Sequence, residues 1–189
     1  MTDIDGGAKL DVGSITNAEE MFGYCKNITS IDFTDFDSSN IISMRNIFNY
    51  NLKSINFTNF DTSKVTDMLG TFSEIQSTTL DLSNFDTSNV VTMNGIFGNC
   101  KKLTTLDLSN FDTSKVTNMD SMFYNCSALE TLDYSLNGFP NNGIAPDLSL
   151  CTALKTLRLH GHGNANSTIV NNFINSSKVP STCIVTLVD

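Results

Sequence analysis

The sequence predicts an α/β repeat fold, a solenoid with parallel strands and short helices in about seven or eight coils. A phrase returns along the chain: "LDLSNFDTSKVTNMDSMFYNC" starts at Leu106, and "LDLSNFDTSNVVTMNGIFGNC" starts at Leu80. Its Phe-Asp pair recurs at intervals of 24, 25 and 26 residues, at Phe36, Phe60, Phe85 and Phe111. A second observation is that the apolar rhythm changes within each copy, from period two to steps of three and four.

The change of rhythm assigns one strand and one short helix to each copy. Leu106 and Leu108 alternate with polar residues, as in a strand. Helical spacing follows at Val116, Met119, Met122 and Phe123. Two capping boxes, Thr117 with Asp120 and Thr16 with Glu19, predict helix starts. Further strands are expected at Leu10–Val12, Ile31–Phe33, Ile55–Phe57, Leu80–Leu82, Leu132–Tyr134, Leu157–Leu159 and Val185–Leu187.

The chain reads as one domain, residues 1–189, with atypical ends. A clipped copy, "SITNAEEMF", lies in the N-terminal part, residues 1–30, and regular repeats occupy residues 31–131. Residues 132–160 are variant repeats, and residues 161–189 no longer fit the pattern and are expected to cap the stack. Terminal repeats of a solenoid are commonly atypical because they close an otherwise open core.

The four copies from Ile31 to Cys126 resemble the BspA-type leucine-rich repeats of bacterial surface proteins. They follow the pattern L-x-x-L-x-L-S-x-F-D-T-S-x-V-x-x-M-x-x-M-F, and looser copies extend the likeness over about residues 8–160. The resemblance implies a right-handed leucine-rich-repeat solenoid and an exposed or secreted recognition module, often discussed as adhesive. It supplies no catalytic residue.

Composition and charge narrow the possible partners. The formal net charge is −9 with 11 basic residues, which argues against nucleic acid. The longest apolar runs are too short to cross a membrane, so no membrane insertion is expected. The N-terminus lacks the pattern of a signal peptide, and near-perfect repeats begin almost at once. We therefore expect a fragment of a longer exported chain, at the cell surface or secreted, and a monomer.

The strand face is the predicted binding surface, because residues flanking the buried Leu or Ile of each strand must point outward. Adjacent strands lie about 4.8 Å apart, so a column of aspartates along this face should repel unless protonation, a cation or a basic partner relieves it. A plainer interpretation is that these polar residues only keep the sheet soluble. The candidate ligand-binding residues are Asp32, Asn56, Asp81, Asp107, Asp133, Arg158, Thr79, Thr105 and Thr131.

Three further sets of residues have structural interpretations. Aspartates of the Phe-Asp pairs, such as Asp86, are expected to cap turns. Four cysteines share one repeat position and are expected to be buried, reduced thiols: Cys25, Cys100, Cys126 and Cys151. His160 and His162 would face the same way on a strand, but no third ligand is evident, so we predict neither a metal site nor a cofactor.

No nucleophile elbow, phosphate loop or dinucleotide fingerprint occurs, so no enzymatic activity is predicted. The leading hypothesis is a ligand-binding module that holds a protein or glycan, for example in a host extracellular matrix, through many weak identical contacts. The alternative is a structural spacer or stalk that presents another domain.

Overall fold

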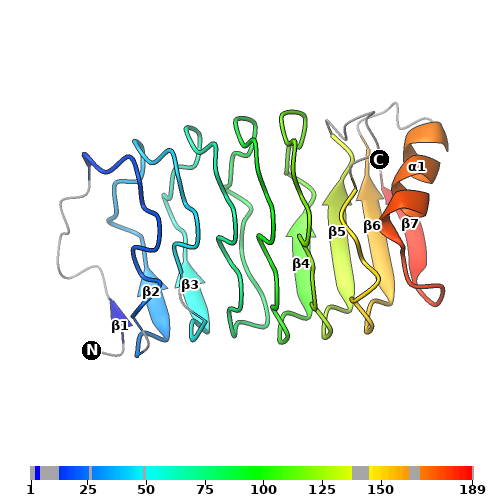
Figure 1. The fold of residues 1–189 in the computed structure, drawn as a ribbon, viewed down its shortest axis with the longest axis horizontal. Helices are drawn as coiled ribbons and strands as arrows, with labels where there is room; N and C mark the ends of the chain where they lie inside the picture. The colour runs from blue at the N-terminus through cyan, green and yellow to red at the C-terminus, as the bar shows by residue number, and fades with distance from the viewer. Residues whose placement is uncertain are drawn as a thin grey trace.

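The structure is a computed structural model that describes residues 3–4, 13–25, 27–48, 50–137, 145–161 and 167–188. The chain forms a parallel-strand solenoid of about six turns, close to the number of coils expected. Its two ends lie at opposite ends of the stack (Figure 1). The strands are β1 (Asp3–Ile4), β2 (Ser30–Asp32), β3 (Ser54–Asn56), β4 (Thr105–Leu108), β5 (Thr131–Ser135), β6 (Thr156–His160) and β7 (Ile184–Val188).

All described strand pairs are parallel, and their register follows the repeat. Leu106 pairs with Leu132, which pairs with Leu157, and all three are buried. Along β4 exposed and buried side chains alternate. The predicted alternation is thus confirmed in β2, β4, β5 and β6, where the apolar residues line the core and polar residues between them face outward.

The strands form two sheets, β1-β2-β3 and β4-β5-β6-β7, because the segment between β3 and β4 does not pair as a strand. In the coils of β2 to β6 a buried Leu or Ile stands three residues before the first apolar residue of the strand, as Leu103 does before Leu106. Here that place belongs to Ser77, which is also buried. Its hydroxyl donates to the carbonyl of Thr79 at 2.6 Å, and this local bond competes with the ladder. The predicted strand at Leu80–Leu82 is therefore wrong, although Leu82 is still buried.

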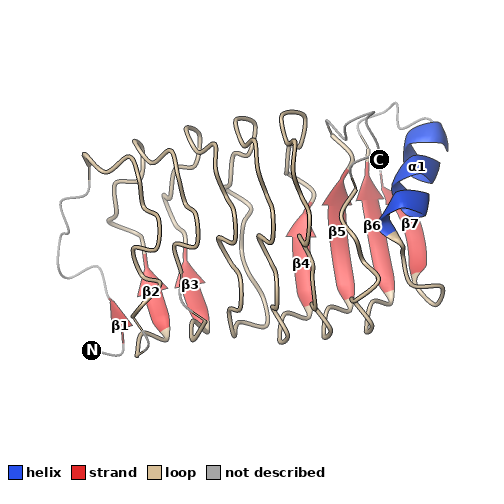
Figure 2. Ribbon diagram, viewed as in Figure 1, coloured by secondary structure: helices blue, strands red, loops and turns tan. Residues whose placement is uncertain are grey.

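The opposite wall of the solenoid consists of turns, and the short helix predicted for each copy does not form (Figure 2). Left-handed backbone interrupts every helical run; Ser121, with φ of 58°, lies between Val116 and Phe123. Equivalent positive φ values occur at Glu20, Asn46, Gly70 and Gly95. Successive turns join through parallel bridges that run Asn17, Ser43, Asp67, Thr92 and Asn118.

The two predicted capping boxes are also wrong. The N–H of Asp120 donates to the side chain of Asn118 at 2.9 Å, and the N–H of Glu19 donates to that of Asn17 in the same way. Each turn is therefore closed by an asparagine one residue after the expected threonine. A side-chain amide that binds the N–H two residues later forms a turn without needing a helix behind it.

Phenylalanines and hydroxyls stack from coil to coil inside the walls. The rings of Phe48, Phe72, Phe97 and Phe123 form a nearly parallel column with centroids 5.6–5.7 Å apart. The buried hydroxyl of Thr87 accepts the N–H of Asp112 at 2.8 Å and donates to its carbonyl at 3.0 Å. Thr62 contacts Asp86 in the same manner. Each repeat thus packs a phenylalanine ring and a threonine hydroxyl against the next repeat, which explains why these residues recur at the same positions of the repeat.

The C-terminal end departs from the repeat. The helix α1 (Ser167–Ser177) packs the buried ring of Phe173 against Tyr134, with centroids 4.8 Å apart. The strand predicted at Val185–Leu187 is confirmed within β7. The expected strand at Leu10–Val12, and His162, lie outside the described residues. No described helix is long and apolar enough to span a bilayer.

Candidate ligand-binding face

The strand face is defined here as the outward side of the two sheets together with the segment 79–82 between them. The candidate residues lie on it in two groups. Strand register sets Asp32 beside Asn56 in the first sheet, and Asp107, Asp133 and Arg158 in a row in the second. Thr105, Thr131 and Thr156 form a parallel row. Thr79 and Asp81 lie on the unpaired segment, so the structure does not bring all predicted residues into one continuous column.

Hydrogen-bond donors two residues later in the chain already bind the carboxylates of Asp32 and Asp81 on this face. The Asp32 carboxylate accepts the N–H and the hydroxyl of Thr34 at 2.9 and 2.6 Å. These bonds hold the pKa of Asp32 below its usual value. Ser83 contributes the same two bonds to Asp81 and lowers its pKa as well. Protonation is therefore not what relieves the predicted repulsion at these two positions; the hydroxyl two residues later stabilises the charge.

Between β2 and β3, Asn56 replaces an aspartate and joins neighbouring coils. Its amide donates to the Asp32 carboxylate at 3.0 Å and to the Thr34 hydroxyl at 3.1 Å. Its own oxygen accepts the N–H and hydroxyl of Thr58. A neutral donor next to the carboxylate thus removes the like-charge contact in the first sheet.

In the second sheet, basic residues of the chain itself meet the carboxylate row. Asp133, which is partly buried, accepts a bond from Arg158 at 3.0 Å and lies 2.7 Å from Nε2 of His160. The sequence pattern places His160 on the outward face with Arg158, and the structure brings both of them to Asp133. In the described part of the chain, no cluster of three His, Cys, Asp or Glu residues could hold a metal ion. The sequence signal for the Asp133 cluster is the repeat register, which places positions 133, 158 and 160 on adjoining strands.

Two hollows flank Asp81 where the sheet is broken. The larger has a volume of about 270 Å³ and the smaller about 130 Å³. Asp81 and Ser83 line both, so this segment forms the ridge between them. The larger hollow is lined by Ile55, Asn56, Phe57, Thr58, Asn59, Asp81, Ser83 and Asn84. Its walls present carboxylate, hydroxyl and amide groups, which together can both donate to and accept from a polar ligand.

The aspartates of the Phe-Asp pairs cap turns, as predicted. The carboxylate of Asp86 accepts the N–H of Ser88 at 2.9 Å, and that of Asp112 accepts the N–H of Ser114 at 2.8 Å. Asp37 and Asp61 bind Ser39 and Ser63 similarly. These side chains belong to the architecture of the loops.

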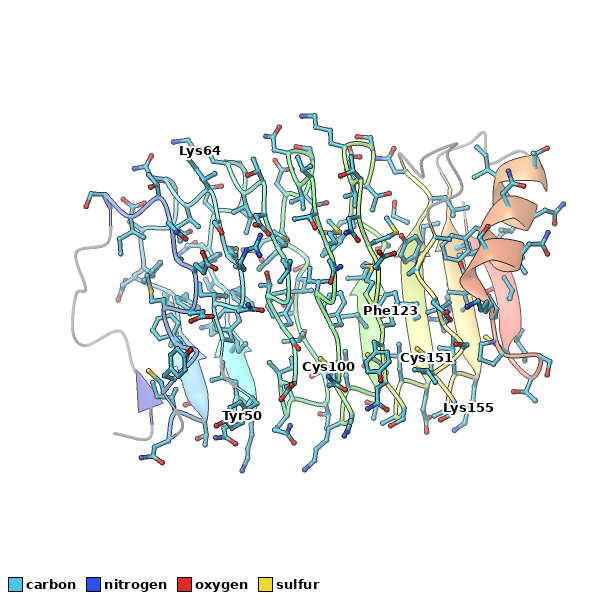
Figure 3. All side chains as sticks on the ribbon, viewed as in Figure 1. Tyr50, Lys64, Cys100, Phe123, Cys151 and Lys155 are labelled. Atoms are coloured by element: carbon cyan, nitrogen blue, oxygen red, sulfur yellow. The ribbon has the colours of Figure 1, made fainter. Side chains whose placement is uncertain are left out.

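The cysteine column is mostly buried, as expected. Cys100, Cys126 and Cys151 are buried free thiols, and Cys25 is half-buried. Figure 3 places Cys100 and Cys151 toward the lower edge of the solenoid, away from the upper edge where Lys64 lies. Cys126 donates to the carbonyl of Phe97 at 3.0 Å. Burial raises the pKa of Cys151 to about 12, so this thiol is a poor nucleophile at neutral pH.

Comparison with known sequences assigns the repeats to a family. The family described as "Mycoplasma protein of unknown function, DUF285" matches residues 3–56 and 49–139. The chain belongs to the DUF285 family. The matched DUF285 region contains the break between the two sheets and both hollows, whereas Arg158, α1 and β7 lie beyond it. No curated protein and no solved structure matches the chain.

Proposed function

We propose that this DUF285 solenoid is a non-enzymatic ligand-binding module of a bacterial cell-surface protein, built from BspA-type leucine-rich repeats. It would hold a protein or glycan on its strand face and serve adhesion, as part of a longer exported chain. The observation that carries the proposal is the ridge of Asp81 and Ser83 between two polar hollows. This ridge offers a ligand recessed shape as well as polar groups.

The chemistry of the face favours a polar ligand bound through many contacts. Asp32, Asp81 and Asp107 are exposed, and each retains acceptor capacity beyond its bonds to the residue two positions later. The chain has no tryptophan and few basic residues, so the usual anchors of tight interfaces are scarce. Repetition along a rigid face then supplies strength through multivalency.

A structural spacer is the second candidate, and a specific observation favours it. Most aspartates of the face already bind local donors, and buried hydroxyls connect neighbouring coils between Thr62 and Asp86 and between Thr87 and Asp112. Such a stack is a stiff rod whose length is set by its repeat number. In this case the aspartates of the face serve solubility and turn formation alone.

The two functions separate in a binding experiment. The purified chain is immobilised and tested against extracellular-matrix proteins, mucin and glycans, with and without calcium. A triple variant, Asp32→Asn, Asp81→Asn and Asp107→Asn, removes three charges from the strand face while the amide oxygen still accepts the local N–H bonds. The matched control, Asp61→Asn, Asp86→Asn and Asp112→Asn, removes three charges from the turn-capping column instead.

Binding by the parent and the control, with at least about tenfold weaker binding by the strand-face variant, is the expected result. Equal losses in both variants would mean that net charge, not the face, attracts the partner. No binding by the folded parent to any member of the panel would favour the spacer.

A further inference from the structure

β7 lies at the C-terminal end of the stack, and its outer edge is apolar. Among the described strands, β7 pairs only with β6. Its sequence, IVTLV, contains neither charge nor proline. Natural sheets usually protect an edge with lysine, proline, a bulge or a covering element, because a bare apolar edge recruits another strand. Figure 1 shows α1 and β7 at this end of the solenoid.

The core side of this last strand is not fully covered. Leu187 is in register with the buried Leu159, so its side chain points toward the interior side of the sheet. Even so, 60% of Leu187 is exposed. Leu159, the equivalent residue one coil earlier, is 0% exposed. Burying such side chains stabilises by about 1.5–3 kcal/mol each when it is complete.

The backbone of β7 shows which groups face the open edge. The N–H of Ile184 donates to the carbonyl of Lys155 at 2.8 Å, and the carbonyl of Val188 accepts from the N–H of Gly161 at 3.3 Å. In a parallel ladder alternate residues bond to the same neighbour, so Ile184, Thr186 and Val188 face β6. The N–H and carbonyl groups of Val185 and Leu187 therefore point outward from the edge.

We infer that the β7 edge binds a second copy of this chain, with the two β7 strands antiparallel about a two-fold axis through Thr186. In that arrangement Val185 of each copy lies opposite Leu187 of the other, and each such pair exchanges two hydrogen bonds. The two outward-facing residues are symmetric about Thr186, so one strand is complementary to itself, as a two-fold interface requires. The side chains of both pairs also lie on the core side, so the two apolar cores join.

Charge favours contact at this end of the molecule. The whole chain carries a net charge of −9, which opposes association of two copies in general. From residue 145 onward, however, the sequence has only two acids, Asp147 and Asp189, against Lys155, Arg158 and Lys178. Lys178 is paired with Asp147, and Arg158 with Asp133. Two copies can therefore meet tail to tail without strong repulsion.

The dimer should be weak, because one strand edge is small compared with the roughly 1,600 Å² of a standard stable interface. Sedimentation equilibrium from about 1 µM to about 1 mM should show a monomer–dimer transition. Leu187→Lys places a charge at both apolar pairs and should weaken the dimer by about tenfold or more. Val91→Lys is the matched control, since Val91 is an exposed apolar residue on a distant coil, and it should leave the dimer unchanged.

Disulfide trapping tests the geometry without an added charge. In a background of Cys25→Ser and Cys183→Ser, the substitution Thr186→Cys places two thiols across the axis. Directly opposite residues of this type have Cα atoms about 4.5 Å apart, within the roughly 4.4–6.8 Å that a disulfide spans. Mild oxidation should give a covalent dimer, whereas Thr117→Cys in the same background should not.

A chain that stays monomeric over the whole concentration range overturns the inference. Association that persists in Leu187→Lys, or that gives no cross-link through position 186, also overturns it, since head-to-tail stacking would behave in that way. The test is independent of the proposed ligand binding on the strand face.

Discussion

The hydroxyl contacts between coils give the most direct test of why this fold is stable. Thr87 is 1% exposed, and its hydroxyl both accepts from and donates to the backbone of Asp112. Thr87→Val keeps the shape of the side chain and removes the hydroxyl. Two part-buried backbone groups of the next coil then lose their partner. A net hydrogen bond stabilises by about 1 kcal/mol and an orphaned buried group costs about 1–3 kcal/mol, so the expected loss is about 2 kcal/mol.

The control for this substitution comes from the chain itself. Thr117 is exposed, and its hydroxyl donates to the carbonyl of Val91, which also accepts the backbone N–H of Thr117 at 2.8 Å. Val91 occupies the equivalent place in the preceding coil. Thr117→Val therefore orphans nothing and should change the free energy of unfolding by less than about 0.5 kcal/mol.

Urea unfolding followed by circular dichroism measures both variants. We expect a lower midpoint for Thr87→Val with an unchanged slope, because the surface exposed on unfolding is the same. If Thr87→Val unfolds within about 0.5 kcal/mol of the parent, the hydroxyl column contributes nothing to stability and the explanation of the repeated threonine is wrong. An equal loss in Thr117→Val would point to a general intolerance of valine in these walls.

Three other predictions concern backbone, acid and thiols. Ser121→Gly, at φ of 58°, should raise the free energy of unfolding by about 0.5–1 kcal/mol. Gly95→Ala, at φ of 59° with open space around an added Cβ, should lower it by a similar amount. Thermal unfolding measures both, and a destabilised Ser121→Gly or a stabilised Gly95→Ala would contradict the strain argument. The bond from Lys178 lowers the pKa of Asp147 to about 2. The ionised carboxylate therefore stabilises the fold above the unfolded pKa of about 3.9, and this stabilisation is lost as the pH falls toward 2. Asp147→Asn should make the free energy of unfolding depend less on pH in this range, and an unchanged pH dependence would count against this ion pair. Native protein at pH 8 should show fast reaction of Cys25 and Cys183 with a thiol reagent and slow reaction of Cys100, Cys126 and Cys151, and rapid modification of all five would show that the coils open readily.

Much of the candidate site could be predicted from the sequence, because strand alternation is a local property. The outward direction of Asp32, Asp107 and Arg158 follows from period two once Leu106 and its equivalents are assigned to the core. The satisfaction of those aspartates could also have been found. The spacing Asp-x-Ser or Asp-x-Thr recurs on the strand face just as it does in the turns, where its capping role was recognised.

The short helices were mispredicted because apolar spacing does not report backbone handedness. Val116, Met119 and Phe123 are buried together, as the spacing required, but a left-handed residue at Ser121 lets turns bury them equally well. Helix formation needs several consecutive right-handed residues, and one left-handed position ends it.

The sequence by itself determined the solenoid, its period, its buried columns of Phe, Leu and Met, and the polar character of the strand face. Each of these depends on spacing within a repeat. The tertiary structure decided where the sheet breaks, where Asp133 meets Arg158 and His160, and how far β7 is left uncovered. Those features depend on which residues of neighbouring coils face one another, and small differences such as Ser77 in place of leucine change them. The repeat pattern predicts the features that all coils share, whereas the features of a single coil depend on its contacts with neighbouring coils.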